Sequence, residues 1–309
     1  MPFLIAAENL IGFTGGSKLT QMNAHNHKKP LIKQGWLRVL LFTCFYFILL
    51  VLAGIVLVLS LDKGNPALTA DRLFYIHFLV NALVSFLALW LFRTLVDRQT
   101  VASLGFGFSK HGAHAGTGFF MGILLVCTGT LVLSFTHHLE WTGSVFDPND
   151  LFISLGLMVI VALYEEAIFR GYILNNLMDS MNKWGALLLS ALAFALAHSG
   201  NPGASVLSIV NIFIAGLLLG INYIYTKNLW FGILLHFTWN FFQGPILGYE
   251  VSGVHLQSHF QHDIKGSPLL TGGAFGLEGS VIALVLYLLA VAALVMVYER
   301  KFRPVVVEG

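Results

Sequence analysis

Apolar residues fall along this chain in long runs that are separated by polar segments. A helix needs roughly 20 mainly apolar residues to cross a bilayer. Eight runs approach or exceed that length, and the fifth is the shortest. They cover residues 37–61, 73–96, 118–135, 151–174, 184–198, 206–225, 230–247 and 280–298. The pattern predicts an all-α, polytopic membrane protein with about eight transmembrane helices.

The composition supports a membrane protein and argues against a nucleic-acid partner. Of the 309 residues, 57% are hydrophobic and 10% are charged, whereas soluble domains carry roughly 25% charged residues. The formal net charge is only +2, so the expected partner is the lipid bilayer and no nucleic acid. Cys44 and Cys127 lie inside apolar runs, where we interpret them as small core residues rather than a disulfide or a metal-binding pair.

Lysine and arginine are unevenly divided between the two sides of the predicted bundle. With the N-terminus inside, thirteen of the seventeen lie in inner segments, three (Lys63, Arg72 and Lys265) in outer segments, and Arg170 within the fourth run. Positive residues favour the cytoplasmic side, so both termini are expected there. We expect a flexible tail over 1–36, an eight-helix domain over 37–300 with its motif core at 150–245, and a second tail over 301–309. The outer connection 248–279 is either a lid or a loose loop, and we favour the loop.

The fourth run contains the residues that such a helix can least easily carry, Glu165, Glu166 and Arg170. A charge near the centre of a lipid-embedded helix costs about 2.5–3.5 kcal/mol on insertion scales. Glu166 and Arg170 are four residues apart and therefore share a helix face, which predicts an ion pair. Glu165 is rotated by about 100° and has no counterion within the helix. These residues are either used chemically, or they join helices or line an aqueous cavity.

The fifth run supplies a partner for Glu165. It ends at His198, one turn after Phe194, and a polar turn at 179–183 joins it to the fourth run. Glu165 and His198 are equally far from the centre of that turn, so antiparallel packing would place them at the same depth. Phe194 shares a face with His198 and would form a wall of the site. A histidine alone would more commonly be interfacial.

The seventh run adds His236 and Asn240, which are four residues apart and point the same way. His77 and Asn81 repeat this spacing in the second run, but they lie nearer its outer end without an acidic neighbour, and we interpret them as interfacial. The set thus offers a carboxylate, two imidazoles and an amide. A carboxylate can activate water, and an amide or imidazole can stabilise an oxyanion. Two histidines and a carboxylate are also a zinc ligand set.

Three short patterns in this order resemble the motifs of a known family. They are similar to those of the CAAX prenyl protease 2 / ABI (CPBP) family of intramembrane proteases, and the resemblance covers approximately residues 90–245. The patterns are Glu165-Glu166-x-x-x-Arg170, Phe194-x-x-x-His198 and His236-x-x-x-Asn240. The resemblance implies an all-helical fold with a catalytic cavity inside the membrane, and an endopeptidase that cuts a peptide bond of a membrane-associated substrate.

The resemblance also implies roles for the residues. Glu165 would be the catalytic residue, His198 would help it to activate water, and His236 with Asn240 would stabilise the oxyanion. Zinc, held by Glu165, His198 and His236, is the alternative to a metal-free mechanism, and we favour glutamate-activated water.

Glu166 and Arg170 would be a supporting ion pair, with Phe194 beside them. The expected substrate is a membrane-tethered or lipidated peptide or protein. No organelle-retention or transit signal is evident, and the compact chain favours a multi-pass protein of a prokaryotic plasma membrane. Two other functions stay open: a non-catalytic membrane binding or immunity protein, and an ion- or proton-coupled transporter.

Overall fold

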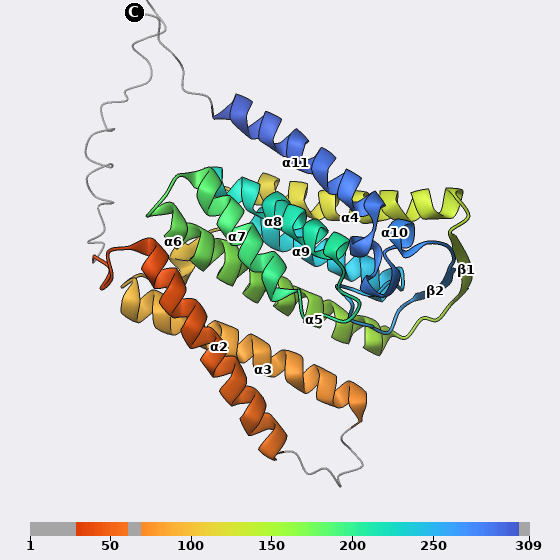
Figure 1. The fold of residues 1–309 in the computed structure, drawn as a ribbon, viewed down its shortest axis with the longest axis horizontal. Helices are drawn as coiled ribbons and strands as arrows, with labels where there is room; N and C mark the ends of the chain where they lie inside the picture. The colour runs from red at the N-terminus through yellow and green to blue at the C-terminus, as the bar shows by residue number, and fades with distance from the viewer. Residues whose placement is uncertain (1–28, 61–68, 303–309) are drawn as a thin grey trace, which may run out of the picture.

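A computed structural model describes residues 29–60 and 69–302 of the chain. Most of the predicted N-terminal tail (1–36) and of the C-terminal tail (301–309) therefore lies outside the described residues. Within them the protein is almost entirely helical, which confirms the all-α prediction (Figure 1).

The helices follow the predicted runs closely. They are α2 (Gly35–Ser60), α3 (Ala70–Leu91), α4 (Gly112–Phe135), α5 (Pro148–Glu166), α6 (Asn175–Met178), α7 (Lys183–Ala197), α8 (Val206–Thr226), α9 (Trp230–Phe241), α10 (Pro268–Thr271) and α11 (Val281–Lys301). Three π-helical segments continue α3, α5 and α9, and they are η1 (Phe92–Val96), η3 (Ala167–Leu174) and η4 (Phe242–Ile246). Short 3-10 turns are η2 (Val101–Leu104), η5 (Gly273–Phe275) and η6 (Leu277–Gly279). Strands β1 (Leu139–Ser144) and β2 (Phe260–Ile264) form one small antiparallel sheet.

Polar residues cap two of the three helices that carry the predicted motifs, α5 and α7, and also α8. The side chain of Asp147 accepts hydrogen bonds from the first backbone N–H groups of α5, and Asn182 does the same for α7. Such N-caps satisfy donors that have no partner within the helix. At the start of α8, Ser205 and Ser208 form a reciprocal capping box. The helix boundaries are thus encoded by the polar residues between the apolar runs.

Six stretches of the described chain are long and apolar enough to cross a membrane, but the predicted count of eight is not confirmed. The six are Gly35–Ser60, Tyr75–Val96, Gly112–Phe135, Pro148–Met178, Val206–Thr226 and Val281–Lys301. The exceptions are α7, with 15 residues, and α9, with 12 before it continues into η4. Most residues of α9 are buried, so protein rather than lipid surrounds this helix and its length need not match the bilayer.

Helix α9 lies inside the bundle, against α4, α5 and α8. Helix α4 approaches it closely through Gly122, where a Cβ atom would lie 2.1 Å from Oγ1 of Thr238. Thr238 in turn donates a hydrogen bond to the backbone oxygen of Phe119 on α4, at 3.0 Å. Small residues permit this kind of close helix contact in membranes. The contact holds fixed the helix that carries the third motif.

Helices α2 and α3 form a separate pair beside the bundle, and their outer ends diverge from it in Figure 1. Their inner ends are anchored by the buried carboxylate of Asp97, which pairs with Arg38 at 3.1 Å and Arg93 at 2.8 Å. Arg38 also contacts Asp179, at the end of α6, at 2.6 Å. The pair is therefore tied to the bundle at its inner end by buried charges.

Residues 248–279 are not a loose loop, and that interpretation of the sequence is wrong. The segment forms β2, α10 and two 3-10 turns, and its Tyr249, Phe275 and Leu277 are at most 1% exposed. The side chain of Asn201, after α7, donates a hydrogen bond to the backbone oxygen of Ser252 at 2.9 Å. These apolar and polar contacts hold the outer connection against the bundle. Because hydropathy along an irregular segment has no period, the sequence did not reveal this packing.

Candidate active site

The first motif lies where the fourth predicted helix changes its winding. Glu165 and Glu166 are the last two residues of α5, and the π-helical η3 begins at Ala167. The π-helix is rare, and where it interrupts an α-helix it is frequently found at functional sites. Spacing along an ideal α-helix does not predict this change. Arg170 lies within η3, and it still reaches back to Glu166 over four residues.

The predicted ion pair between Glu166 and Arg170 is confirmed, and it is wholly buried. A guanidinium nitrogen of Arg170 lies 2.8 Å from Oε1 of Glu166, with side-chain exposures of 2% and 0%. The other terminal nitrogen donates to the backbone oxygen of Gly216 on α8 at 3.1 Å. The guanidinium carbon lies 4.4 Å from the centre of the Phe194 ring, within the range of a cation–π contact. The pair thus connects η3 with α7 and α8.

Glu166 also holds a histidine, which sequence reasoning missed. Nδ1 of His236 lies 3.1 Å from Oε1 of Glu166, the same oxygen that contacts Arg170. A carboxylate oxygen only accepts, so Nδ1 of His236 is the donor. Gly232 lies one turn before His236, and a Cβ atom there would be 2.7 Å from Oε2 of Glu166. A small residue at that spacing is the one sequence signal that could have indicated the contact.

The structure brings Glu165 together with both predicted histidines. Oε2 of Glu165 lies 3.8 Å from Nε2 of His236 and 4.0 Å from Nε2 of His198. These separations are longer than direct hydrogen bonds, and the buried Oε2 has no hydrogen-bond partner among the described residues. Glu165 and His198 therefore meet, as their equal distance from the turn at 179–183 predicts.

The two imidazole rings are oriented by their other nitrogens. Nδ1 of His198 lies 2.8 Å from the backbone oxygen of Phe194, which can only accept a hydrogen bond. Nδ1 of His236 is the donor to Glu166. In the neutral ring, one nitrogen donates and the other accepts. Nε2 of each histidine is therefore free to take a proton on the side that faces Glu165.

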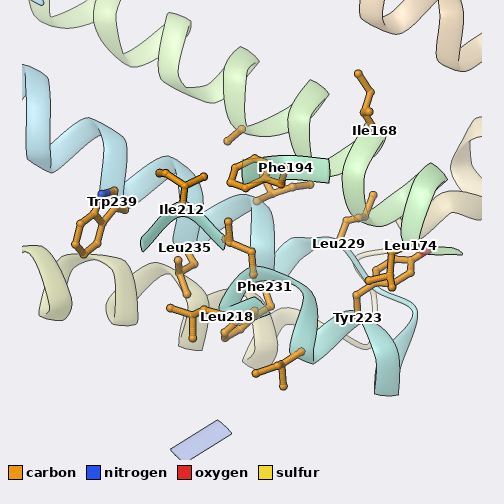
Figure 2. Packing of buried hydrophobic residues seen from close by; sticks show 14 of the residues in the cluster. Ile168, Leu174, Phe194, Ile212, Leu218, Tyr223, Leu229, Phe231, Leu235 and Trp239 are labelled. Atoms are coloured by element: carbon orange, nitrogen blue, oxygen red, sulfur yellow. The ribbon is translucent and has the colours of Figure 1, made fainter. Parts of the chain in front are cut away.

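Phe194 and Asn240 complete the predicted set. The Phe194 ring lies 4.6 Å from the ring of His198 and is perpendicular to that of His236 at 6.1 Å, between ring centres. Figure 2 shows it within the packed core. Asn240 is 6% exposed, and its side chain makes no hydrogen bond to another described residue. Both line the cavity that contains Glu165 and the two histidines.

The cavity measures about 680 Å³ and is lined mainly by apolar side chains of α2, α3, α5, α7, α8 and α9. His77 and Asn81, interpreted from sequence as interfacial, also line it, and Nε2 of His77 lies 3.1 Å from Nδ2 of Asn81. Glu278, from the outer connection, lines it as well. Sequence reasoning missed Glu278, because a carboxylate in an irregular segment has no periodic context that would indicate its burial.

The donor types at this centre are those of a zinc site, but their spacing does not fit one. Ligands about 2.0–2.1 Å from a tetrahedral zinc lie roughly 3.3 Å from one another. Glu165 is 3.8 and 4.0 Å from the two imidazole nitrogens. In the part of the chain that the structure describes, no group of three or more His, Cys, Asp and Glu side chains is arranged to hold a metal ion.

The fold and this centre define a polytopic membrane protein with a carboxylate and two imidazoles facing one apolar cavity. Residues 147–242 match the family model of type II CAAX prenyl endopeptidase, Rce1-like. The match covers the segment that carries the three motifs. This segment is therefore similar to the CAAX prenyl protease family, which supports a CAAX-type intramembrane protease in general terms. Comparison with curated proteins and with solved structures gave no match.

The close approach of Gly232 to Glu166 leads to a testable prediction. Gly232→Ala places a methyl group 2.7 Å from Oε2 of Glu166 and 3.2 Å from the backbone oxygen of Leu219. Overpacking of this kind costs about 1–3 kcal/mol, so we expect a lower melting temperature in detergent and displacement of His236.

Gly156→Ala is the matched control. Gly156 lies within α5, and a Cβ atom there would meet nothing within 4 Å. Alanine is the better helix former, so this variant should be at least as stable as the wild type. Equal melting temperatures for the two variants would contradict the account of the Glu166 contact.

Proposed function

We propose that the protein is an endopeptidase in which Glu165 activates a water molecule to cut a peptide bond within the membrane. One observation carries the proposal: Oε2 of Glu165, buried and without a hydrogen-bond partner, faces Nε2 of His198 and His236 at 4.0 and 3.8 Å. Polar groups separated by more than 3.5 Å commonly share a water molecule. A carboxylate in hydrogen-bond reach of water can act as its general base.

The residues can then perform hydrolysis with balanced proton transfers. Glu165 takes a proton from water while the water oxygen bonds to the carbonyl carbon of the substrate. His198 helps to hold that water through Nε2. When the tetrahedral intermediate collapses, the C–N bond breaks and the proton on Glu165 passes to the leaving amine. These steps use only side chains that line the cavity.

Stabilisation of the oxyanion falls to two residues of α9. The side-chain amide of Asn240 makes no hydrogen bond to another described residue. It lies one turn from His236 on the same helix. Nε2 of His236 can donate once its ring is protonated, and the Glu166 carboxylate at Nδ1 would balance that charge. Removal of one such donor typically costs 10²–10³-fold, or about 3–4 kcal/mol, in rate.

The proposed substrate is a peptide segment that enters the cavity from the membrane, either tethered to it or lipidated. The apolar lining supports this choice, because an apolar segment loses little on transfer from lipid. These steps do not involve zinc, because the distances from Oε2 of Glu165 to the two imidazole nitrogens are longer than those between ligands of one zinc ion. Glu166 and Arg170 position His236 and Phe194 and do not touch the substrate.

We also propose that the protein lies in a prokaryotic plasma membrane with both chain ends on the cytoplasmic side. The unequal distribution of lysine and arginine supports this orientation. The described ends lie at one end of the bundle: the backbone N–H of Trp36 bonds to Ser180, and Lys183 lies 3.7 Å from Glu299. The sheet of β1 and β2 lies at the other end (Figure 1).

Substitution of Glu165 tests the mechanism. We expect Glu165→Gln to reduce cleavage of a fluorogenic membrane-tethered peptide by at least about 10²-fold in reconstituted vesicles, because the amide cannot take the proton. Glu140→Gln, at an exposed carboxylate of β1, is the control and should cleave like the wild type. Cleavage that survives in Glu165→Gln would rule out the assigned base.

The metal-free version makes a separate prediction. Activity should persist after exhaustive chelation, and elemental analysis of the purified protein should find no stoichiometric zinc. A known zinc protease in the same vesicles should lose its activity. Loss of cleavage on chelation, with recovery on adding zinc, would overturn the metal-free mechanism and leave Glu165, His198 and His236 as the ligands.

The orientation can be tested by labelling single cysteines in intact bacterial cells, after replacing Cys44 and Cys127 with alanine. A membrane-impermeant maleimide should label Lys265→Cys, beside β2, in intact cells. It should label Lys110→Cys, an exposed position before α4, only after permeabilisation. The reverse pattern would contradict the proposed orientation.

A further inference from the structure

Glu278 is a second carboxylate at the cavity, and the mechanism above does not use it. It lies in the 3-10 turn η6 of the outer connection and is 4% exposed. It lines the same cavity as Glu165. Position 278 lies outside residues 147–242, so the family match does not account for it.

Three donors point at the two oxygens of Glu278. Oε1 accepts a hydrogen bond from Nε1 of Trp239 at 3.0 Å. Oε2 accepts from the backbone N–H and the hydroxyl of Ser252, both at 2.7 Å. A carboxyl group accepts on both oxygens, without donating, when it is ionised. The contacts therefore hold a negative charge at this place, and they join α9 to the outer connection.

No basic side chain of the described chain balances this charge. The contacts of Glu278 include no lysine, arginine or histidine. No lysine or arginine lines the cavity, where Glu165 and Glu278 are the two carboxylates. Arg170, buried in the same bundle, is paired with Glu166 and stacked on Phe194. The three hydrogen bonds offset part of the cost of burying this charge, and a cation in the cavity beside Glu278 would be stabilised further by charge attraction.

The contact of Glu278 with Trp239 of α9 relates the carboxylate to the proposed scissile bond. Its partner Trp239 follows His236 by three residues, which is a rise of about 4.5 Å along the helix axis. An extended peptide advances about 3.3 Å per residue. Because Glu165, His236 and Glu278 also line one cavity, a peptide bound at Glu165 can present a side chain near the bond that is cut to Glu278. Asn240, one residue beyond Trp239, is 94% buried, lines the same cavity and makes no side-chain hydrogen bond within the described chain, so its amide is available to a bound peptide.

We propose that Glu278 selects substrates that carry a lysine or arginine within about two residues of the scissile bond, on the side that faces the outer connection, and that it disfavours a free C-terminal carboxylate there. The proposal rests on the endopeptidase function proposed above. Its physical basis is an ion pair formed in an apolar cavity, where charge attraction is stronger than in water. A substrate carboxylate would instead meet a second negative charge.

The experiment uses the full-length protein in vesicles with membrane-tethered fluorogenic peptides. Lysine, norleucine or glutamate is placed in turn at the first and second positions on each side of the scissile bond. At one position we expect lysine to exceed norleucine by at least about tenfold in kcat/KM, equivalent to about 1.4 kcal/mol. Glutamate, or a free C-terminal carboxylate in place of an amide, should be the poorest.

Glu278→Gln separates charge from structure. The amide keeps the size of the side chain and an oxygen that accepts from Trp239, while its NH2 group can donate to the Ser252 hydroxyl but not replace the acceptor of the Ser252 backbone N–H. The melting temperature is therefore measured beside cleavage: norleucine peptides should be cleaved within about threefold of the wild-type rate while the lysine preference disappears. Glu250→Gln is the matched control, because Glu250 belongs to the same outer connection, is partly exposed and does not line the cavity. It should keep the lysine preference.

Each remaining outcome decides the question. A lysine preference that survives in Glu278→Gln, or no preference at any position, would overturn the proposal. Equal loss of cleavage for all peptides with a lower melting temperature would show that Glu278 only fastens the outer connection. If the wild type cleaves none of the peptides, the endopeptidase function fails, and equilibrium binding of the same labelled peptides tests Glu278: tighter binding of lysine that is lost in Glu278→Gln supports it, and equal binding refutes it.

Discussion

One oxygen of Glu166 accepts hydrogen bonds from two helices at once, and the site depends on this contact. Oε1 accepts one hydrogen bond from the Arg170 guanidinium of η3 and one from Nδ1 of His236 of α9. Because a charge deep in an apolar bundle is stable only when it is paired, Arg170 cannot move away without leaving two buried ions behind, and loss of His236 would remove a hydrogen bond from the buried carboxylate. Arg170 extends the constraint to Gly216 of α8 and to the Phe194 ring of α7. The geometry around Glu165 is thus set by the carboxylate beside it.

The separation of tasks between adjacent carboxylates follows from helix geometry. Oε1 of the wholly buried Glu166 is held by Arg170 and His236. Glu165 lines the cavity, where its Oε2 faces two imidazoles without a direct hydrogen bond. Two residues that differ by one position on a helix face directions about 100° apart. A single turn therefore provides a buried carboxylate that supports the neighbouring helices and a second carboxylate that faces the cavity, where the proposed mechanism needs a base.

Sequence reasoning was most accurate where geometry is local. The Glu166–Arg170 pair follows from residues four apart, and the meeting of Glu165 with His198 follows from two helices joined by a short turn. The contact between Glu166 and His236 could not be predicted in this way, because it depends on how α5 and α9 pack side by side. Glu278 was missed for the same reason: its burial depends on the tertiary packing of an irregular segment. Span length predicted eight crossings because it treats every helix as facing lipid, which does not hold for the enclosed α9.

The pair of α2 and α3 gives the cavity an unusual wall. Its residues Phe42, Tyr46 and Leu50 line the cavity, while only 6% of the apolar window of α2 is buried. One thin helix layer therefore separates the reacting groups from the surrounding lipid on that side. Acyl chains pressing on α2 become part of the enclosure, so the space that a substrate meets is a joint property of the protein and the thickness and packing of the membrane around it.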